Sequence, residues 1–192
     1  MDLLDQLPFE VQDELFTRYI FNNFIHNFRF FFQIEKIKKM SGTSLGFIRD
    51  FYTWKNKEYR NFMIAILSKL EPIFYNKGTK IYNELDEFGE INFITHGDVS
   101  VGFKINNFEQ YPVKFKNRCV IGGFGVTFKQ RSSFIYKATS NCKGLFIRRG
   151  NWHDILNEQD PEICKNFKKN ICIDFILKIK SKLDIHKKKA IK

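Results

Sequence analysis

The sequence predicts an α+β protein built on an eight-stranded antiparallel β-roll of jelly-roll type, flanked by N-terminal helices and a long C-terminal helix. Apolar residues recur every three or four positions in the first and last thirds of the 192-residue chain. Between Glu71 and Arg148 they alternate with polar residues, and turn residues separate about eight short runs. Many short strands with regular turns favour a small closed or jelly-roll-like antiparallel barrel.

The first third is predicted to be helical. In LPFEVQDELFTRYIFNNFI the apolar residues recur at helical spacing: Leu7, Val11, Leu15, Tyr19 and Ile20. Pro8 suits a first helical turn, and a second helical stretch is predicted over about 44–70. Between the two, HNFRFFFQIEKIKKMSG joins an aromatic cluster, Phe28 and Phe30 to Phe32, to a basic run. Two interpretations of the cluster stay open, a hinge packed under a core and an apolar contact with a partner helix.

The middle third is predicted to form strands in a regular order. IFYNKGTKIY is a strand, a turn at 76–78 and a second strand. INFITHGDVSVGFKI has the form of a hairpin whose turn is His96-Gly97-Asp98. QYPVKFKN alternates again, and SSFIYKATSNCKGLFIRR is interpreted as two strands around a turn at 140–144.

The last third returns to the helical period. Trp152, Ile155 and Leu156 begin a short helix, and Asp160-Pro161 is a helix start with Asp as the cap and Pro in the first turn. Apolar residues then recur every four positions: Ile163, Phe167, Ile171, Phe175, Ile179 and Leu183. We therefore expect one long amphipathic helix that ends in the basic segment HKKKAIK.

Charge and composition limit the classes of function. The net charge is +11 and the pI is about 9.5, which permits nucleic acid, anionic lipid or an acidic partner. The four cysteines show no C-x-x-C spacing and the four histidines are scattered, so we expect no metal site and a reducing compartment. The acidic N-terminus argues against a signal peptide, and no apolar run approaches the ~18 residues that span a bilayer.

The segment VIGGFGVTFKQRSSF, residues 120–134, is the strongest candidate for a binding site. Three glycines lie within four residues, and hydroxyl and basic side chains follow them. Phe128 stands where a dinucleotide fingerprint needs its third glycine, and the surroundings are all-β, so a βαβ nucleotide site is excluded. No Gly-Lys-Ser/Thr and no nucleophile elbow accompanies the segment, so the sequence predicts no enzyme and no catalytic residue.

The order of elements, read with these motifs, resembles the cyclic-nucleotide-binding domain. LEPIFYNKGTKIYNE is similar to the family's opening strands, EINFITHGDVSV to its hairpin with the turn glycine at Gly97, and GGFGV to its Gly-x-Phe-Gly-Glu. ATSNCKGLFIRRGNWHDIL is similar to its closing strands and the helix after them. The start of the chain resembles the end of the C-linker in voltage-gated and cyclic-nucleotide-gated cation channels. We therefore expect C-linker-like helices over 1–32, a helical segment with an insertion over 33–70, and the β-roll with its C-terminal helices over 71–192.

The resemblance implies a cradle for a cyclic phosphate, but several positions depart from the family's pattern. The family's Glu, which accepts the ribose hydroxyl, is Val126, and its phosphate-binding Arg falls on Ser132 with Arg131 one residue away. The loop is about three residues short, which argues against the helical turn that supplies N–H groups to the phosphate. Phe134 is a bulky residue where the family has a small one. The candidate pocket comprises seven residues: Gly123, Phe124, Gly125, Val126, Arg131, Ser132 and Ser133.

The resemblance implies a cytoplasmic regulatory domain of a cation channel, more specifically a potassium channel, in which a degenerate phosphate cassette binds cAMP or cGMP weakly or not at all. Its partners would be the pore or neighbouring subunits in a homo- or hetero-tetramer, on the cytoplasmic side of a membrane. One alternative is a working cAMP or cGMP sensor that uses Arg131. The other is a basic adaptor for anionic lipid or nucleic acid. Nucleic acid is disfavoured because the Phe residues lie at core spacing.

Overall fold

The computed structural model describes residues 7–37 and 49–191 and divides the chain into two compact units. The first unit comprises the described residues up to Ser68 together with Ile155–Asn170. The second comprises Lys69–Asp154 and the C-terminal part of the chain from Ile171. Two helices, α5 (Arg149–Glu158) and α6 (Pro161–Phe175), run from one unit into the other.

Short helices form most of the first unit. They are α1 (Phe9–Glu14), the π-helical turn η2 (Leu15–Ile20), α2 (Asn22–Asn27) and α3 (Lys57–Leu67). The strands β1 (Glu35–Ile37) and β2 (Arg49–Phe51) pair antiparallel between α2 and α3. The predicted helix over 44–70 is therefore too long, because the helix begins only at Lys57; residues 38–48 of the expected insertion lie outside the described residues. Thr53 and Asn56 form a hydrogen-bonded turn that precedes it.

The aromatic cluster after α2 packs inside this unit. Phe28 and Phe32 are buried, and the rings of Phe32 and Phe62 lie 6.0 and 5.1 Å from the ring of Phe167 in α6. The hydroxyl of Tyr59 donates to the carbonyl of Phe32 at 3.0 Å. The interpretation of a segment packed under a core therefore applies to these rings. Phe30 is exposed instead, and so are Val11 and Tyr19 of the N-terminal helical pattern.

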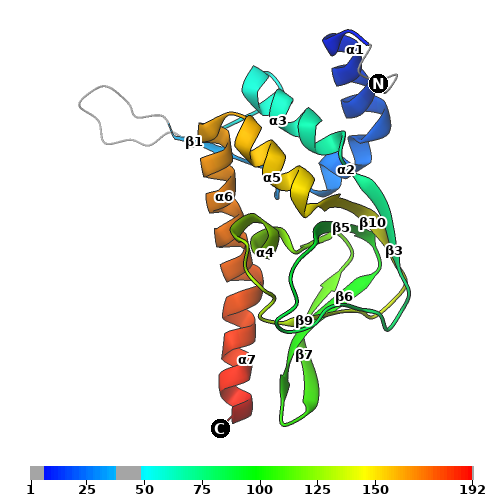
Figure 1. Ribbon diagram of the computed structural model, residues 1–192, viewed down its shortest axis with the longest axis vertical. Coiled ribbons are helices and arrows are strands. Elements are labelled where there is room, and N and C mark those ends of the chain that lie inside the picture. The colour runs from blue at the N-terminus through cyan, green and yellow to red at the C-terminus, as the bar shows by residue number, and fades with distance from the viewer. Residues whose placement is uncertain (1–6, 38–48, 192) are drawn as a thin grey trace, which may run out of the picture. The chain divides into compact units, whose positions relative to one another are not determined.

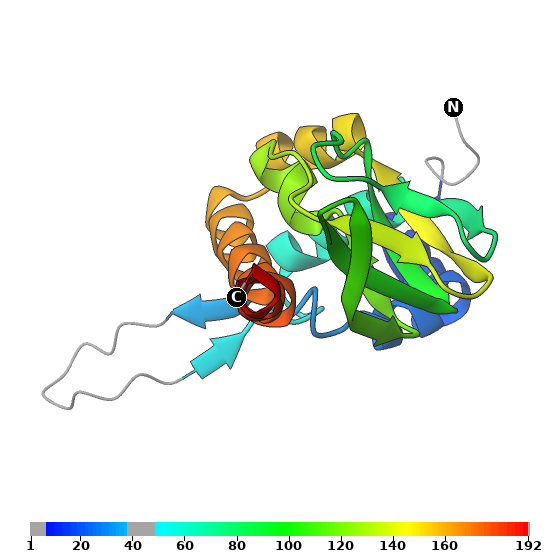
Figure 2. The ribbon, with the colours of Figure 1, turned by 90° about the horizontal axis from the view of Figure 1, so that it is seen from below.

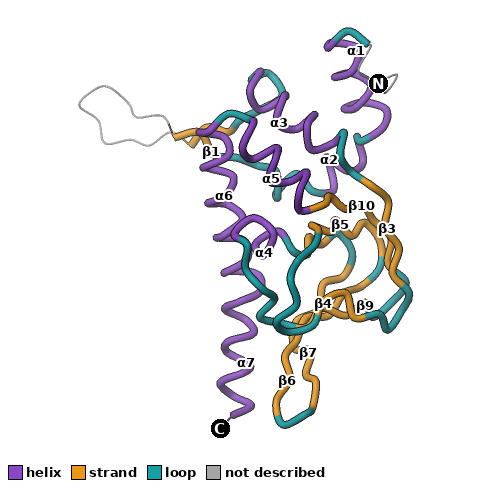
Figure 3. The backbone as a smooth tube through the Cα atoms, in the orientation of Figure 1, coloured by secondary structure: helices purple, strands orange, loops and turns teal. Residues whose placement is uncertain are grey.

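Eight strands of the second unit form two four-stranded antiparallel sheets, so the predicted fold class is confirmed. One sheet has the order β3 (Glu71–Tyr75), β10 (Cys142–Arg148), β5 (Glu90–His96) and β8 (Cys119–Ile121). The other has the order β4 (Lys80–Tyr82), β9 (Ile135–Ala138), β6 (Asp98–Ile105) and β7 (Phe108–Lys116). Consecutive residues of β5, β6 and β9, which Figure 3 draws in orange, are buried and contribute to the core, including Phe93, Val101 and Tyr136.

The predicted pairing of strands across the 96–98 turn is wrong. β5 and β6 lie in different sheets, because the chain crosses from one sheet to the other at Gly97. Gly97 has a φ of +95°, and a Cβ there would lie 2.4 Å from the carbonyl oxygen of Asn141. The strands on either side of the 140–144 turn, β9 and β10, are likewise split between the two sheets.

The long hairpin of the roll is instead β6–β7. Asn106 and Asn107 link its strands with φ values of 49° and 68°. A two-residue hairpin turn whose twist matches that of the strands needs a left-handed backbone at both of its residues. Asn is one of the few residues that adopt this conformation readily. The Asn-Asn pair was therefore a hairpin signal in the sequence.

The long C-terminal helix over 161–191, which we call the C-terminal rod, forms as expected. α6 continues through the π-helical turn η3 (Ile176–Lys180) into α7 (Ser181–Ile191). Asp160 caps the start of α6, since its carboxylate accepts from the amides of Glu162 and Ile163 at 3.0 and 2.9 Å. Residues that recur every four positions rotate gradually around an α-helix, because the helix has 3.6 residues per turn. The π-helical turn has more residues per turn and offsets this rotation, so Ile179 and Leu183 remain on the buried face.

α7 lies beside β6 and β7 in the second unit, where Figure 2 shows it end-on next to the roll. Across residues 7–37 and 49–191, no helix has both the length and the apolar character needed to cross a bilayer.

Candidate functional site

The glycine-rich segment forms a short helix, α4 (Gly123–Phe128), between β8 and β9. The expectation that the shortened loop would lose its helical turn is therefore wrong. Gly122 precedes the helix with a φ of +83°, and Lys129 ends it with a φ of +54°. The amide of Val126 donates to the carbonyl of Gly122 at 2.8 Å, and the amide of Gln130 donates to that of Gly125 at 2.9 Å. Left-handed residues at both ends allow a complete helical turn in fewer residues.

Two side chains of α4, Thr127 and Phe124, anchor it to the helices that follow the roll. The hydroxyl of Thr127 donates to the carbonyl of Gly123 at 2.6 Å and accepts from Trp152 Nε1 at 3.0 Å. Both Thr127 and Trp152 are buried. The ring of Phe124 stacks on that of Phe175, with centroids 4.3 Å apart and planes 8° apart. The candidate cassette is thus connected directly to α5 and to the C-terminal part of α6.

A second aromatic contact fills the inner face of α4. A Cβ on Gly125 would lie 2.0 Å from the ring of Phe88, so a larger residue at position 125 would displace that ring. The ring of Phe88 in turn lies 4.5 Å from that of Tyr82 and 6.0 Å from that of Tyr136. Val126, which replaces the family's Glu, is completely buried, with 0% of its surface exposed. This part of the cassette is apolar and closely packed.

The position that corresponds to the family's phosphate-binding Arg is closed by local hydrogen bonds. Ser132 is only 1% exposed, and its hydroxyl donates to the carbonyl of Phe134 at 2.6 Å. The amide of Ser132 donates to the carbonyl of Asp86 at 2.8 Å, and the amide of Leu85 donates to that of Ser132 at 2.7 Å. Phe134 itself is 4% exposed. The backbone at Ser132 is therefore paired with the 83–87 loop.

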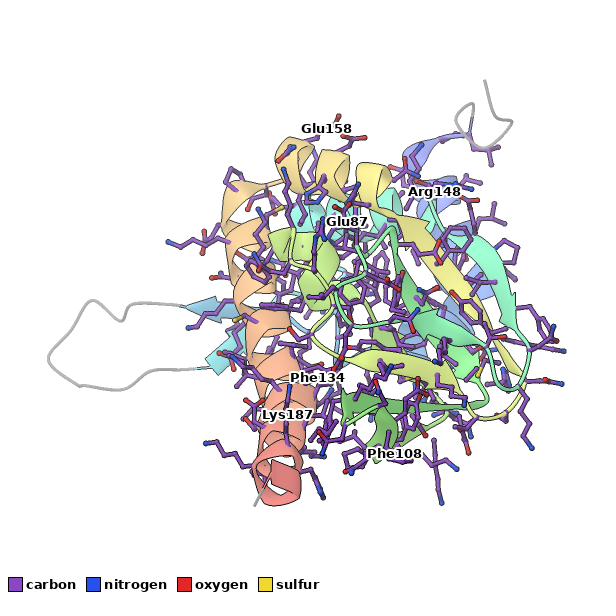
Figure 4. All side chains as sticks on the ribbon, turned by 60° about the horizontal axis from the view of Figure 1, so that its bottom comes forward. Glu87, Phe108, Phe134, Arg148, Glu158 and Lys187 are labelled. Atoms are coloured by element: carbon purple, nitrogen blue, oxygen red, sulfur yellow. The ribbon has the colours of Figure 1, made fainter. Side chains whose placement is uncertain are left out.

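The charged and polar residues of the cassette lie outside this packed region. Arg131 is exposed, and its guanidinium is 3.3 Å from the carboxylate of Glu87. Arg149, at the start of α5, forms a second ion pair with the same carboxylate at 3.3 Å (Figure 4 labels Glu87). Ser133 is exposed as well. Of the seven candidate residues, Gly123, Gly125, Val126 and Ser132 are buried, Phe124 is half-buried, and Arg131 and Ser133 are turned toward solvent.

Burial keeps the ionisable groups of the roll interior neutral. Desolvation raises the pKa of the Tyr82 and Tyr136 hydroxyls well above their ordinary value. Burial also raises the pKa of the Cys119 thiol to about 12, and the nearby Cys142 adds to the shift. In the described part of the chain, His, Cys, Asp and Glu side chains form no group of three that could hold a metal ion. The interior therefore offers no charge of its own to an anion.

Sequence reasoning missed the residues that position the cassette. Phe88, Trp152 and Phe175 contact α4 from a loop and from two later helices, and Thr127 is the residue of α4 that accepts the hydrogen bond from Trp152. In the sequence, Trp152 stands out only as one of two tryptophans in the chain. Phe175 stands out only as a member of the apolar repeat of the long helix. Their contacts depend on the folded roll, so spacing along the chain does not indicate them.

The eight-stranded roll described above is similar in fold to a solved structure of a candidate cyclic nucleotide binding protein. No protein-family model and no curated protein matches the chain. Among solved structures, the chain is similar to a candidate cyclic nucleotide binding protein from Ruegeria pomeroyi DSS-3, with a TM-score of 0.51 and 17% identity over 57% of this chain and 49% of that one. The likeness to this structure shows the shared fold.

Two further structures are less similar. A candidate cAMP-binding regulatory protein from Silicibacter pomeroyi DSS-3 has a TM-score of 0.49 and 18% identity over 55% of this chain and 49% of that one. The regulatory domain of PKA from Toxoplasma gondii, solved with cAMP, has a TM-score of 0.48 and 11% identity over 57% of this chain and 41% of that one. The chain thus spans about half the length of the first structures that it matches.

Proposed function

We propose that this chain is a cyclic-nucleotide-binding homology domain with a partial C-linker, which serves as a cytoplasmic regulatory domain of a cation channel and not as an enzyme. The more specific form of the proposal is a potassium channel. Its roll keeps the architecture of a nucleotide sensor, while its phosphate cassette is degenerate. Regulation would then pass through packing contacts of the domain and not through a bound nucleotide.

The closed state of the cassette is the observation that carries this proposal. A working site needs a carboxylate for the ribose and a guanidinium for the phosphate, and charge-assisted bonds of this kind contribute about 1.5–3 kcal/mol each. The buried Val126 supplies neither group, and the hydroxyl of Ser132 is already bonded to Phe134. Arg131 is exposed and forms an ion pair with Glu87. The neighbouring Phe134 occupies buried space in the same loop.

The channel context rests on the N-terminal helices. The segment LLDQLPFEVQDELFTRYIFNNFIHNFRFFF resembles the end of a C-linker, and its described residues form α1, η2 and α2. Val11, Tyr19 and Phe30 are exposed on this segment. Exposed apolar groups that gather on one segment mark contacts with other chains. We propose the pore or neighbouring subunits of a tetramer as the partners that cover them.

Calorimetric titration with cAMP and cGMP tests the degenerate cassette. We expect dissociation constants above roughly 100 μM, or about −5.5 kcal/mol, for both nucleotides. Low-micromolar binding that is abolished by Arg131→Ala would contradict the proposal and establish the alternative, a working sensor. Arg118→Ala, at an exposed turn of the roll, is the matched control for loss of a positive charge.

A rescue experiment separates loss of the site from loss of the roll. The double variant Val126→Glu, Ser132→Arg restores the two charged groups at buried positions, so its melting temperature should fall without ligand and rise on addition of cGMP. The matched control is Val126→Glu, Ser133→Arg, in which the guanidinium starts from an exposed position. A ligand-induced rise in both variants would show that the register of the arginine does not matter.

A further inference from the structure

Two projecting elements bring exposed apolar residues to one end of the second unit. Phe108, which follows the two-residue turn of the β6–β7 hairpin, is 75% exposed, and Ile185 in α7 is 55% exposed. The hairpin tip and the C-terminal end of α7 point in the same direction in Figure 1, and Phe108 and Lys187 lie toward the same edge in Figure 4. We call this surface the basic end. It comprises Lys104, Phe108, Lys114, Lys182, Ile185, His186, Lys187 and Lys188.

The positive charge of the basic end is only partly neutralised. Glu109 is engaged by Lys80 at 2.5 Å and by the hydroxyl of Tyr111 at 2.8 Å, and the Lys80 hydrogen bond lowers the pKa of the Glu109 carboxyl. Asp98 pairs with Lys114 at 3.2 Å. Lys104, Lys182, Lys187 and Lys188 form no ion pair with any described carboxylate. The lysines on both elements therefore present uncompensated charge.

A groove of about 330 Å³ separates the two elements of the basic end. Its walls are formed by Pro112, Val113, Lys114, Lys182, Ile185 and His186. Lysines stand on both sides of it, Lys182 from α7 and Lys114 from β7, and apolar side chains lie between them. A cleft of this size is at the lower end of the range for small-ligand sites. Apolar walls with basic groups at the rim suit an amphiphilic, anionic group.

We propose that the basic end docks onto the surface of an anionic lipid membrane. Phe108 and Ile185 would enter the interface between headgroups and acyl chains, while the lysines face anionic headgroups. Such binding scales with buried apolar area plus attraction to anionic lipid, and each Lys or Arg near the surface contributes about 1 kcal/mol. The proposal rests on this surface alone and holds whether or not the cassette binds a nucleotide.

The arrangement of the apolar groups favours a membrane over other anionic partners. A partner helix needs a continuous apolar groove with anchors at helical spacing. Phe108 and Ile185 are instead exposed on two separate elements, β7 and α7. Nucleic acid would engage the lysines through its phosphates but would leave these apolar side chains in water. A lipid interface accepts both kinds of group at once.

Flotation of the full chain with lipid vesicles tests the proposal. The probes are phosphatidylcholine vesicles and vesicles in which about a quarter of the lipid is phosphatidylserine. We expect binding to the second kind only, weakened by added salt because exposed charges are screened. Absence of binding to the phosphatidylserine vesicles overturns the proposal.

Matched variants locate the contact. Lys182→Gln with Lys187→Gln should weaken vesicle binding about 25-fold, at about fivefold for each lysine. Phe108→Ser should weaken it about fivefold. The controls are Lys77→Gln with Lys143→Gln, which make the same change in net charge near the 76–79 turn, and Phe74→Ser, an exposed phenylalanine of β3. All these side chains are at least partly exposed, and circular dichroism checks that each variant is folded.

Three outcomes would contradict the assignment. Equal loss of vesicle binding in the control variants would show that the vesicles are attracted by the net charge of the whole chain and not by the basic end. Loss of binding in Leu177→Ser as large as in Phe108→Ser would mean that the exposed face of the long helix lies flat on the membrane instead. Retention of a DNA duplex or of polyglutamate by the basic end, without vesicle binding, would assign it to nucleic acid or to an acidic protein.

Discussion

The hydrogen-bond chain from Trp152 through Thr127 to Gly123 is expected to set the stability of the cassette helix. Trp152 Nε1 donates to the hydroxyl of Thr127 at 3.0 Å, and that hydroxyl donates to the carbonyl of Gly123 at 2.6 Å. Thr127→Val keeps the shape of the side chain and removes the hydroxyl, so the perturbation is the loss of these hydrogen bonds and not a cavity.

The magnitude follows from burial. Trp152 is completely buried, so the variant removes the hydroxyl acceptor of its indole N–H in an environment with little water. An orphaned buried donor costs about 1–3 kcal/mol, and an ordinary lost hydrogen bond costs about 0.5–1.5 kcal/mol. We expect Thr127→Val to lower the free energy of unfolding by about 2–3 kcal/mol. That is a large part of the ~5–15 kcal/mol total of a typical domain.

Urea unfolding followed by far-ultraviolet circular dichroism measures this change, and amide hydrogen exchange of α4 shows whether the loss is local. The control is Thr139→Val, which removes a hydroxyl bonded to the carbonyl of Asp98 at 3.1 Å. The amide of Thr139 still donates to the same carbonyl, so no buried donor is orphaned and the cost should stay below about 1 kcal/mol.

A double-mutant cycle sharpens the test. In a Trp152→Phe background the indole N–H is gone, so Thr127→Val should cost at least about 1 kcal/mol less than it does in the original protein. The reasoning fails if the cost of Thr127→Val is the same in both backgrounds, or if that variant unfolds within about 0.5 kcal/mol of the original protein.

Two further predictions follow from the second unit. Gly125→Ala should destabilise the roll by about 1–3 kcal/mol in urea unfolding, because the added Cβ would meet the ring of Phe88 at 2.0 Å; Phe88→Leu in the same chain should recover part of the loss. The Arg148 guanidinium hydrogen-bonds Glu71 and lowers the pKa of that carboxyl. The ionised Glu71 therefore stabilises the folded protein above its ordinary pKa of 4.5, and this stabilisation is lost as the pH falls through the lower pKa of the folded state. The Arg148→Gln variant lacks this contribution, so its free energy of unfolding should depend less on pH across that window.

The strands of the roll could be predicted from their alternation, but their partners could not. Val99, Val101 and Phe103 of β6 are buried, as the period of two indicates, but Ser100 and Gly102 between them are buried as well. The alternation of apolar and polar residues does not indicate which sheet a strand joins. The residues around Gly97 have the sequence of a hairpin turn. In the structure the chain instead crosses from one sheet to the other at this glycine, where the backbone of residues 141–142 lies close to it. The hairpin lies one turn later, at Asn106-Asn107.

The candidate site was predicted in part. The location of the glycine-rich segment between the last strands follows from the motif, and a helical turn occupies it in spite of the missing residues. The turn forms because Gly122 and Lys129 take left-handed conformations at its two ends, and because Trp152 and Phe175 reach it from α5 and α6. These anchors are 25 and 51 residues from the residues that they contact, Thr127 and Phe124. No local pattern reports contacts of that separation.

The sequence by itself determined most strands of the roll and the long C-terminal helix. Apolar periodicity depends on neighbours along the chain, so it marked the alternating strands and the four-residue repeat of the long helix, while the Asp160-Pro161 pair marked the start of that helix. Only the tertiary structure decided how the eight strands divide between two sheets, that Phe28 and Phe32 pack inward while Phe30 does not, and that Ser132 bonds its own loop. Packing, burial and hydrogen-bond partners depend on residues that are distant in the sequence, and these groups meet only when the roll closes.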